Sequence, residues 1–422
     1  MSMAKREISL SIEPLLLDQP YKQVVKASSN KNPADDGKTA KAIFLFFRIL
    51  LTFIIICVTI QLLFRFLPLL LSLIQAAINR FQNYEKQTEN FFTNEAPEFV
   101  HQFVDFEKRF GRVWSGEKER WQRFKVFEKN LKEIERLNAE AIKAKRNVTF
   151  GINGMTDKSD EEMRQILLPL DHFKKRRLNA KFIRELNPIL RESFTARSDE
   201  VLEEYPSHFD WRPKGVVTPV KAQGQCGSCW AFAAVATTES AHAVAHRELI
   251  SLSEQELLDC NLENNACQGG NEDKAFSFIH ERGLVSEWEY PYVAHRQNSC
   301  RMNEKSENLT TIDVAVFINP DEDSIIDWLL NFGPVNVGIA VPPDMKPYTG
   351  GIYHPSDFDC KFRVLGLHAL LVVGYGVTDD GVKYWIVKNS WGDTWGQEHG
   401  YVNFIRGINA CGIEDEPIGI LA

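Results

Sequence analysis

The chain has 422 residues, more than one ordinary domain of about 100–200 residues, so we expect two or three parts. Hydrophobic residues make up 44% and charged residues 25%, which excludes a mainly disordered or collagen-like protein. Residues 1–200 hold 34 Lys+Arg and 26 Asp+Glu, whereas residues 201–422 hold 15 and 31. The acidic second half argues against nucleic acid as the main partner. Seven of the eight cysteines lie in that half, which indicates an oxidising compartment.

The first part of the chain predicts a membrane anchor. Residues 1–41 are polar and are expected to form a tail, and residues 42–64 are almost wholly apolar apart from Arg48 and Gln61. About twenty such residues can cross a bilayer as one helix. The alternatives are a buried core helix and a cleaved signal peptide, whose apolar region is about 7–15 residues long and lies near the N-terminus.

The charges of the tail predict the orientation of this anchor. Seven Lys and Arg precede the apolar run, and such a bias favours a cytoplasmic N-terminus. We therefore expect an uncleaved signal-anchor of a single-pass type II protein, with everything after it on the far side. Residues 65–94 are predicted to be a juxtamembrane linker, whose first apolar residues lie in the interface or extend the span.

Helical periodicity begins after residue 95. Phe99, Phe103 and Phe106 fall on one face of a first predicted helix, and a second is predicted from about Gly116 to Ala144. Steps of four or three place one set of residues along a single stripe of the second helix. This stripe consists of Glu119, Arg123, Phe127, Asn130, Ile134 and Asn138. A stripe that mixes polar and apolar side chains indicates buried polar pairing against another element.

These six residues resemble the "ERFNIN" pattern in pro-regions of papain-like cysteine proteases of the cathepsin L-like group. Gly151, Asn153 and Asp157 are similar to the associated G-x-N-x-F-x-D motif, with Met155 in place of Phe. The resemblance implies an inhibitory pro-domain over residues 95–170, whose last stretch runs through the active-site cleft in reverse.

The stretch that follows is expected to be a processing linker. Residues 171–200 contain the basic run from Lys174 to Arg177, which predicts an exposed segment open to proteolytic cutting. Because the pro-region is basic and residues 201–422 are acidic, we also expect electrostatic docking that weakens in acid.

The densest motif runs from Gln223 to Trp230 and contains Cys226 and Cys229. A helix is predicted from Trp230 to about His246, so Cys229 lies at a helix N-terminus, where the dipole favours a nucleophilic thiolate. The pair could also be a redox motif or half of a zinc site, but no second paired cluster exists. Cys-Gly-Ser-Cys-Trp is the local signature of papain-like proteases, with His and Asn far downstream.

Two downstream residues fit as partners of Cys229. His368 follows it by 139 residues and begins a predicted buried strand, and Asn389 follows a second apolar strand. By resemblance to papain-like enzymes from about Tyr205 onward, Cys229 and His368 form the catalytic pair and Asn389 orients the imidazole. Gln223 stabilises the oxyanion together with the backbone N–H of Cys229.

The resemblance also implies which residues contact the substrate. They are Gly269, Gly270, Asn271, Gly338, Gly366, Leu367, Trp391 and Glu416. Gly338 and Gly366 replace larger residues and predict a roomy pocket for the second residue before the scissile bond. Glu416 lies at the floor of that pocket, and its carboxylate predicts acceptance of Arg as well as Leu or Phe. The alternative is that Glu416 points to solvent.

Two positions depart from the family pattern. Leu367 precedes His368 where relatives often have Asp or Asn, so the pH profile is expected to differ. The segment from Trp395 to Tyr401 has one residue more than the usual W-G-x-x-G-Y, which predicts a bulged surface turn.

Six further cysteines in the second half allow fifteen pairings, and spacing alone does not choose among them. The family pairing implies the bridges Cys226–Cys267, Cys260–Cys300 and Cys360–Cys411. Asn147 and Asn308 open Asn-x-Thr sequons and are candidate glycosylation sites. No metal or other cofactor is implied.

Together these features predict an α+β, two-lobed papain-like fold over residues 201–422. A helical lobe (about 205–310) carries Cys229 and a β-barrel-like lobe (about 311–422) carries His368. We expect a cysteine endopeptidase made as a membrane-anchored precursor, acting on protein and peptide substrates, inhibited by its own pro-domain and monomeric once processed. The expected location is an acidic lysosome-like or a secretory or extracellular compartment. The alternative is a catalytically inactive papain-like binding protein, and a redox protein is a further one.

Overall fold

The computed structural model describes residues 97–172, 176–186, 205–301 and 309–422, together with parts of residues 48–80. The chain divides into two units, Met1–Thr93 and Asn94–Ala422. The expected tail lies outside the described residues, as do most of the expected span and the sequon residue Asn308.

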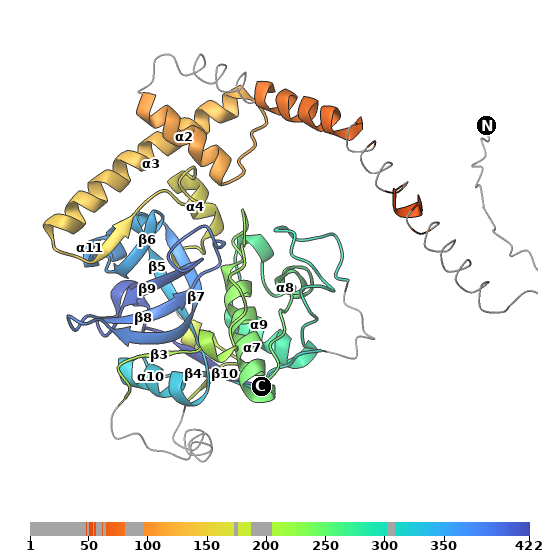
Figure 1. The fold of residues 1–422 in the computed structure, drawn as a ribbon. Helices are drawn as coiled ribbons and strands as arrows, with labels where there is room; N and C mark the ends of the chain where they lie inside the picture. Colours follow the sequence, from red (N-terminus) through yellow and green to blue (C-terminus); the bar gives the residue numbers. More distant parts are fainter. Residues whose placement is uncertain are drawn as a thin grey trace, which may run out of the picture. The chain divides into compact units, whose positions relative to one another are not determined.

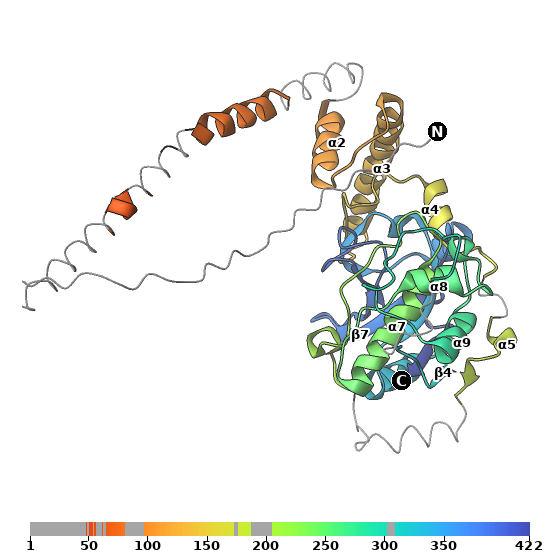
Figure 2. The same cartoon turned by 90° about the vertical axis from the view of Figure 1, so that its right-hand side faces the viewer.

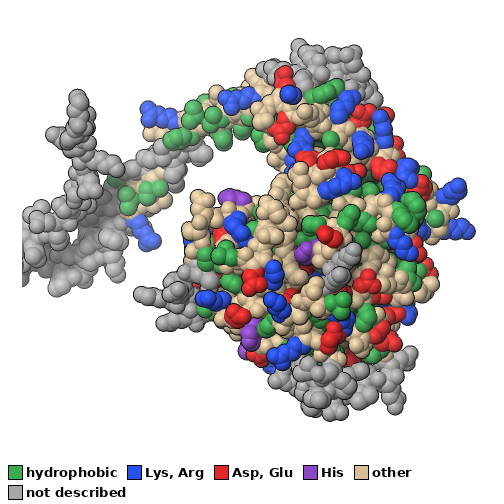
Figure 3. Space-filling model, turned by 180° about the vertical axis from the view of Figure 1, so that it is seen from behind, with side chains coloured by type: hydrophobic (Ala, Val, Ile, Leu, Met, Phe, Trp, Pro, Cys, Tyr) green, Lys and Arg blue, Asp and Glu red, His purple; other side chains and the backbone are tan. Residues whose placement is uncertain are grey.

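In the first unit, residues 65–80 are helical. This helix leaves large apolar side chains exposed, among them Phe66, Leu70 and Ile74 (Figure 3). Within the described stretches, no helix combines the length and apolar character that crossing a bilayer requires.

The second unit begins with a helical pair that has its own apolar core. Helices α2 (Pro97–Arg109) and α3 (Glu117–Lys143) are joined by aromatic contacts. The Phe103 ring lies 5.3 Å from that of Phe127 and 5.5 Å from that of Phe124, and all three side chains are fully buried. We call residues 97–160 the head of the pro-region.

The polar members of the α3 stripe pair with backbone, as the sequence predicts. Asn138 exchanges two hydrogen bonds with the main chain of Phe150, in strand β1 (Val148–Phe150). Buried Asn130 donates to the carbonyls of Thr156 and Lys158. These bonds fix the loop after β1, because an unpartnered buried amide would destabilise the head.

The head continues into α4 (Asp160–Ile166), which starts with a capping box between Ser159 and Glu162. Glu162 also forms a 2.6 Å ion pair with Arg123 of the α3 stripe. After it come α5 (Arg176–Asn179) and the short strand β2 (Arg184–Glu185).

Residues 205–422, which we call the catalytic half because they contain the expected Cys229, His368 and Asn389, have two lobes, with α7 (Cys229–His246) at their boundary. This helix packs against strand β7 (Gly366–Val377) on one side and against α8 (Glu254–Cys260) and α9 (Glu272–Arg282) on the other (Figures 1 and 2). Nearly the whole of α7 is buried, which explains its Ala-rich sequence. Small side chains let the helix lie between both lobes.

The second lobe is built on the sheet. The elements after α9 are β4 (Val314–Phe317), α10 (Glu322–Asn331), β5 (Val335–Val341), β6 (Tyr348–Tyr353), α11 (Asp357–Phe362), β7 (Gly366–Val377), β8 (Lys383–Lys388), β9 (Tyr401–Ile405) and β10 (Ile418–Leu421). The sheet has ten strands in the order β1-β6-β9-β8-β7-β5-β10-β4-β2, with strand β3 (Phe209–Asp210) paired to β7. The pro-region thus supplies both edge strands.

One predicted boundary is wrong. Residues 205–310 were expected in the helical lobe, but Phe209 and Asp210 pair antiparallel with Tyr375 and Gly374 of β7. Trp211 adds to this attachment, since its indole donates to the carbonyl of Leu329 in α10. The chain therefore starts on the β-rich lobe before it enters the helical one.

Other local expectations hold. The three bridges are Cys226–Cys267, Cys260–Cys300 and Cys360–Cys411, as the resemblance implied, and Cys229 is the free cysteine of the described residues. The extra residue near Trp395 forms a turn in which Glu398 and His399 both have positive φ, 47° and 63°. The predicted bulged turn is therefore present.

Candidate active site

Cys229 lies at a helix N-terminus, and hydrogen bonds fix the loop that precedes it. Cys229 is the first residue of α7 and is fully buried. The Ser228 side chain does not cap the helix, and its hydroxyl instead lies 2.7 Å from that of Tyr292. Tyr292 donates to the carbonyl of Gln223 at 2.9 Å. One phenol thus ties together two points of the loop that precedes the thiol.

His368 and Asn389 meet because they lie on neighbouring antiparallel strands. β7 carries His368, and β8 ends immediately before Asn389. The Nε2 atom of His368 lies 2.7 Å from Oδ1 of Asn389, and the Trp391 ring covers the imidazole at 5.0 Å. Nδ1 of His368 has no hydrogen-bond partner among the described residues, so this nitrogen is the one available to a thiol.

Burial favours the neutral forms of both Cys229 and His368 in the precursor. Burial raises the pKa of the Cys229 thiol to about 12. Burial also lowers the pKa of His368 to about 4, although the hydrogen bond to Asn389 opposes that change. Because both side chains are fully buried, the charged thiolate–imidazolium form is disfavoured while the pro-region is in place.

The Gln223 side chain is oriented and already occupied. Its Oε1 accepts from the hydroxyl of Ser390 at 2.7 Å, which turns Nε2 the other way. Nε2 donates to the carbonyl of Ile166, a pro-region residue, at 2.8 Å and to the carbonyl of Cys226 at 2.9 Å. A pro-region carbonyl thus occupies the side-chain amide of Gln223, which the family resemblance implies would donate to the oxyanion.

The end of α4 and the segment after it cross the catalytic half, and we call residues 165–186 the strap. Leu168 exchanges two backbone hydrogen bonds with Leu367, at 2.7 and 2.9 Å, directly beside His368. Farther on, the Asp273 carboxylate accepts the backbone N–H groups of Lys181, Phe182 and Ile183. These contacts of the strap are made by its main chain.

The expected exposed linker is wrong at Arg176. This residue is 2% exposed, and its guanidinium bonds to Glu272 and Glu416 of the catalytic half. A run of basic residues ordinarily indicates a solvated segment, but two carboxylates distant in sequence bury this member. Lys174 and Lys175 lie outside the described residues.

The predicted substrate-contact residues divide into two groups. Gly338, Leu367 and Glu416 line one cavity, together with Arg176 and Leu170 of the strap. Glu416 therefore faces this cavity in the precursor, where its carboxylate accepts from Arg176.

The remaining predicted contacts have different surroundings. A Cβ at Gly270 would lie 2.4 Å from the Trp230 ring, so only glycine fits there. Near Gly269 lies the Leu168 side chain, and a Cβ at Gly366 would be 2.6 Å from Cβ of Leu167. Asn271 is not directed to a substrate in this structure, since its side chain caps α9 by accepting from the N–H of Asp273.

Sequence reasoning missed Glu272. It is the first residue of α9 and its side chain is fully buried, 2.9 Å from Nη1 of Arg176. Acidic residues are common in the first turn of a helix because they interact favourably with the helix dipole. The position of Glu272 in the sequence therefore did not indicate a functional role. Its place two residues after Gly270 was the one available clue.

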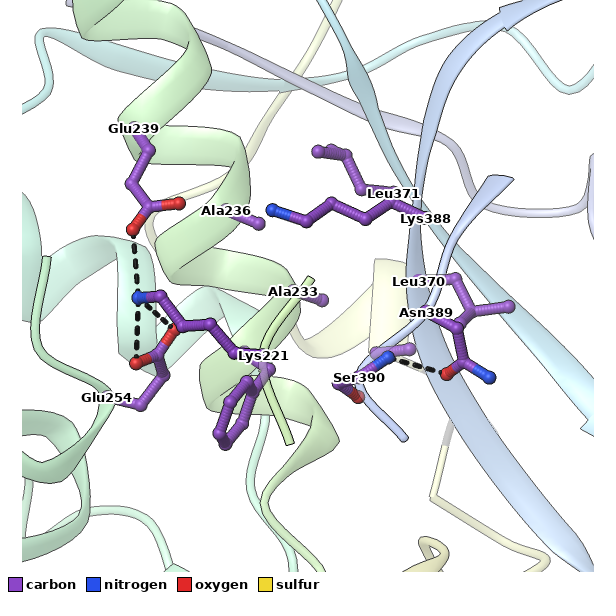
Figure 4. A pocket seen from close by; sticks show the side chains of 12 residues that line it. Lys221, Ala233, Ala236, Glu239, Glu254, Leu370, Leu371, Lys388, Asn389 and Ser390 are labelled. Carbon is purple, nitrogen blue, oxygen red and sulfur yellow. Dashed lines mark hydrogen bonds and ion pairs between the residues drawn. The ribbon is translucent and has the colours of Figure 1, made fainter. Parts of the chain in front are cut away.

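A buried charge cluster lies behind the catalytic residues (Figure 4). Lys221 bridges the carboxylates of Glu239 and Glu254, and Lys388 donates to Thr218. Burial alone would lower the pKa of Lys221, but the two glutamates raise it. Lys388, which precedes Asn389, has its pKa lowered by burial to about 8. This cluster supports the strand end that carries Asn389.

The geometry excludes two of the sequence alternatives. Cys226 is bonded to Cys267, so Cys226 and Cys229 form neither a redox pair nor half of a zinc site in this structure. In the parts of the chain that the structure describes, no cluster of three His, Cys, Asp or Glu side chains is placed to hold a metal. A free thiol at the start of a helix that packs on the strand of a paired imidazole and amide defines a cysteine protease, here with an inhibitory segment across it.

Comparison with known proteins gives the same class. The family model for papain family cysteine protease matches residues 205–421, and that for the cathepsin propeptide inhibitor domain matches residues 103–163. The chain therefore belongs to the papain family of cysteine proteases and is a hydrolase precursor with its own inhibitory propeptide.

Relatives extend over both the pro-region and the catalytic half. The chain is 38% identical over 346 residues to cathepsin F of Drosophila melanogaster, covering 78% of this chain but 52% of that protein. It is 35% identical to cysteine proteinase 1 of Dictyostelium discoideum, covering 74% and 90%. A digestive procathepsin L from the larval midgut of Tenebrio molitor is similar in structure, with a TM-score of 0.66, 32% identity and coverage of 78% and 100%.

Proposed function

We propose that the processed protein is an endopeptidase in which Cys229, His368 and Asn389 carry the chemistry. The observation that supports this most directly is the 2.7 Å contact between His368 and Asn389, which leaves Nδ1 free for the thiol. The inactive binding protein remains the alternative. A complete set of catalytic groups around one buried thiol favours the enzyme.

The proposed mechanism proceeds through an acyl-enzyme. When the strap leaves, solvent reaches Cys229 and His368, and the proton moves from sulfur to Nδ1. The thiolate attacks the scissile carbonyl, and the oxyanion accepts hydrogen bonds from Nε2 of Gln223 and the N–H of Cys229. His368 then protonates the leaving amine, and water hydrolyses the acyl-enzyme. Asn389 holds the imidazole in the required orientation throughout.

The occupied donor of Gln223 supports this assignment. The carbonyl of Ile166 accepts from Nε2 at 2.8 Å, so the site binds a peptide carbonyl in the precursor. Substrates are proposed to lie along Gly269, Gly270 and Leu367 in an extended form, with Trp391 covering the His368–Asn389 bond and Glu416 favouring an Arg side chain.

Active-site labelling tests the function. A thiol-reactive peptide epoxide should label the processed enzyme once, at Cys229, and abolish peptide hydrolysis. Cys229→Ala should keep all three disulfides and lose both labelling and self-processing. Absence of both labelling and peptide hydrolysis in the processed protein would favour the inactive binding protein.

We also propose that the precursor is anchored to a membrane through residues 42–64 and faces a lysosome-like or extracellular space. The apolar run supports this, as do the exposed apolar side chains of the helix at residues 65–80. Exposed Asn147 is a proposed glycosylation site on that side. Protease added to sealed vesicles should remove residues 1–41 only, and digestion of the catalytic half would reverse the topology.

A further inference from the structure

The buried guanidinium of Arg176 is held by two carboxylates of the catalytic half. Its Nε donates to Oε2 of Glu416 at 2.8 Å, and its Nη1 donates to Oε2 of Glu272 at 2.9 Å. Its Nη2 donates to the backbone carbonyl of Glu416 at 3.1 Å. The Arg176 and Glu272 side chains are 0% exposed and that of Glu416 is 19% exposed.

This arrangement belongs to a removable segment. Arg176 lies in the strap, whereas Glu272 and Glu416 stay in the processed enzyme. Within the described part of the chain, Arg176 is the ion-pair partner found for each of these two glutamates. When the strap leaves, two neighbouring carboxylates lose their counter-charge, and buried carboxylates without one are strongly destabilising.

The position and geometry identify what would replace Arg176. Glu416 and Leu367 line the same cavity, and Leu367 directly precedes His368, so a peptide in the cleft can reach it. Two carboxylates contact two different edges of one planar group, which fits the fork of a guanidinium better than the single charge of an ammonium. In addition, Oε1 of Glu272 is buried without a hydrogen-bond partner among the described residues, which leaves one acceptor still open.

We infer that Glu272 and Glu416 form a guanidinium site that Arg176 fills in the precursor and that a substrate arginine fills in the processed enzyme. Arg176 keeps the precursor latent by taking the place of a substrate side chain. Glu272, fully buried, is then a second specificity-determining residue beside Glu416. This inference rests on the proposed endopeptidase function.

The first test compares uncut precursors. The full chain and its variants are exposed briefly to the peptide epoxide, and labelling of Cys229 is measured in the unprocessed band. Arg176→Ala should be labelled about 10- to 100-fold faster, because a buried ion pair is lost, and Arg176→Lys should fall between it and the parent. The matched control is Arg184→Ala, also in the strap, whose exposed side chain makes no ion pair among the described residues and should change the rate less than about twofold.

A double-mutant cycle separates this role from general destabilisation. Glu272→Gln should also speed labelling of the precursor. Adding it to Arg176→Ala should have little further effect, because both changes remove one interaction. Labelling of Arg176→Ala at the parental rate, or effects that multiply in the double variant, would overturn the inference.

The second test uses the processed enzyme and two peptides that differ only in Arg or Leu at the second residue before the scissile bond. Glu272→Gln and Glu416→Gln should each lower the Arg/Leu ratio of kcat/KM about tenfold or more. Asp415→Asn removes a carboxylate that lines the same cavity without contacting Arg176, and should shift the ratio less than about twofold. An unchanged ratio in Glu272→Gln refutes the site alone, whereas no hydrolysis of either peptide by the parent enzyme refutes the proposed function.

Discussion

The head and the strap both contact the catalytic half, but they hold to it by different means. The head has its own aromatic core and docks through polar groups, with Nζ of Lys346 bonded to Asn130 and Asp160. The strap has no core of its own. Its buried apolar side chains Leu168 and Ile183 pack into the core of the catalytic half. The head therefore resembles a bound domain, whereas the strap resembles a bound peptide.

This difference separates recognition from inhibition. The strap occupies Gln223 and pairs with Leu367 beside His368, and most of its described side-chain contacts are with the surface beneath it. We therefore expect the head to supply affinity and to bring the strap to the cleft as an intramolecular ligand. Substitutions in the head and in the strap should therefore have effects that can be measured separately.

The largest expected effect concerns the thiol beneath the strap. With its pKa raised to about 12, Cys229 holds on the order of a thousandfold less thiolate at neutral pH than a thiol near 9. Iodoacetamide labelling of the Cys229 thiol in the uncut precursor should be slow at pH 6 and rise about tenfold per pH unit up to pH 10. In the processed enzyme it should be fast and reach a plateau. If the labelling rate of the precursor stops rising below pH 9, the strap blocks access to Cys229 without raising the pKa of its thiol.

A substitution in the aromatic core of the head should lower the thermal stability of the head without lowering that of the catalytic half. Phe127→Ala removes a fully buried ring and should cost the head about 3 kcal/mol. Thermal unfolding followed by calorimetry should show an earlier transition of the pro-region, with the catalytic half unchanged. Val113→Ala, at a 91% exposed position, is the control and should match the parent. One common transition that shifts as a whole would mean that head and catalytic half unfold together.

The strap should loosen when its clamp is altered. Asp273→Asn replaces a carboxylate that accepts three backbone N–H groups, and the new amide directs its own N–H groups toward one of them. A loss of about 2 kcal/mol is expected for these charged hydrogen bonds. Hydrogen exchange should rise at residues 181–183 and stay unchanged in α3. Equal protection in the two proteins would contradict the clamp.

The smallest effect is expected at the docking contact of the head. Lys346→Met removes a partner of Asp160 and should weaken docking by about 1–2 kcal/mol, measured as faster labelling of the precursor. Burial would raise the pKa of Asp160, but Lys346 outweighs burial and lowers it below 3.8. A carboxyl with a lowered pKa stabilises docking above its ordinary value and loses this only as the pH falls further. The effect of Lys346→Met should therefore be equal at pH 7 and pH 5 and shrink below pH 4.

The lowered pKa of Asp160 limits how far acid can release the pro-region by breaking its ion pair with Lys346. The sequence predicted that acid weakens docking as carboxylates of the catalytic half take up protons. The Asp160–Lys346 pair stays formed at pH 4–5, so a release in that range would have to come from other groups. A difference between parent and Lys346→Met that vanishes at pH 5 would contradict this reading of Asp160.

The sequence predicted most accurately what depends on local pattern. The α3 stripe, the helix that begins at Cys229 and the strand that holds His368 all follow from periodicity, and the resemblance supplied the disulfides. What it missed depends on contacts between distant residues. Arg176 and Glu272 are 96 residues apart, and neither is unusual in its local sequence. The path of residues 205–211 across the lobes was missed for the same reason, because two-residue strand β3 leaves no period to detect.

The strand order has a consequence for the processed enzyme. β1 and β2 stand at opposite ends of the sheet, paired to β6 and β4. Cutting away the pro-region leaves two strands with rows of unpaired backbone groups, which are templates for association between chains. While it remains attached, the same segment protects those edges during the slow assembly of a sheet with long-range pairings. The edges of this sheet are therefore best protected from aggregation in the precursor. After processing, conditions in the compartment where the enzyme works must limit association through the exposed edges.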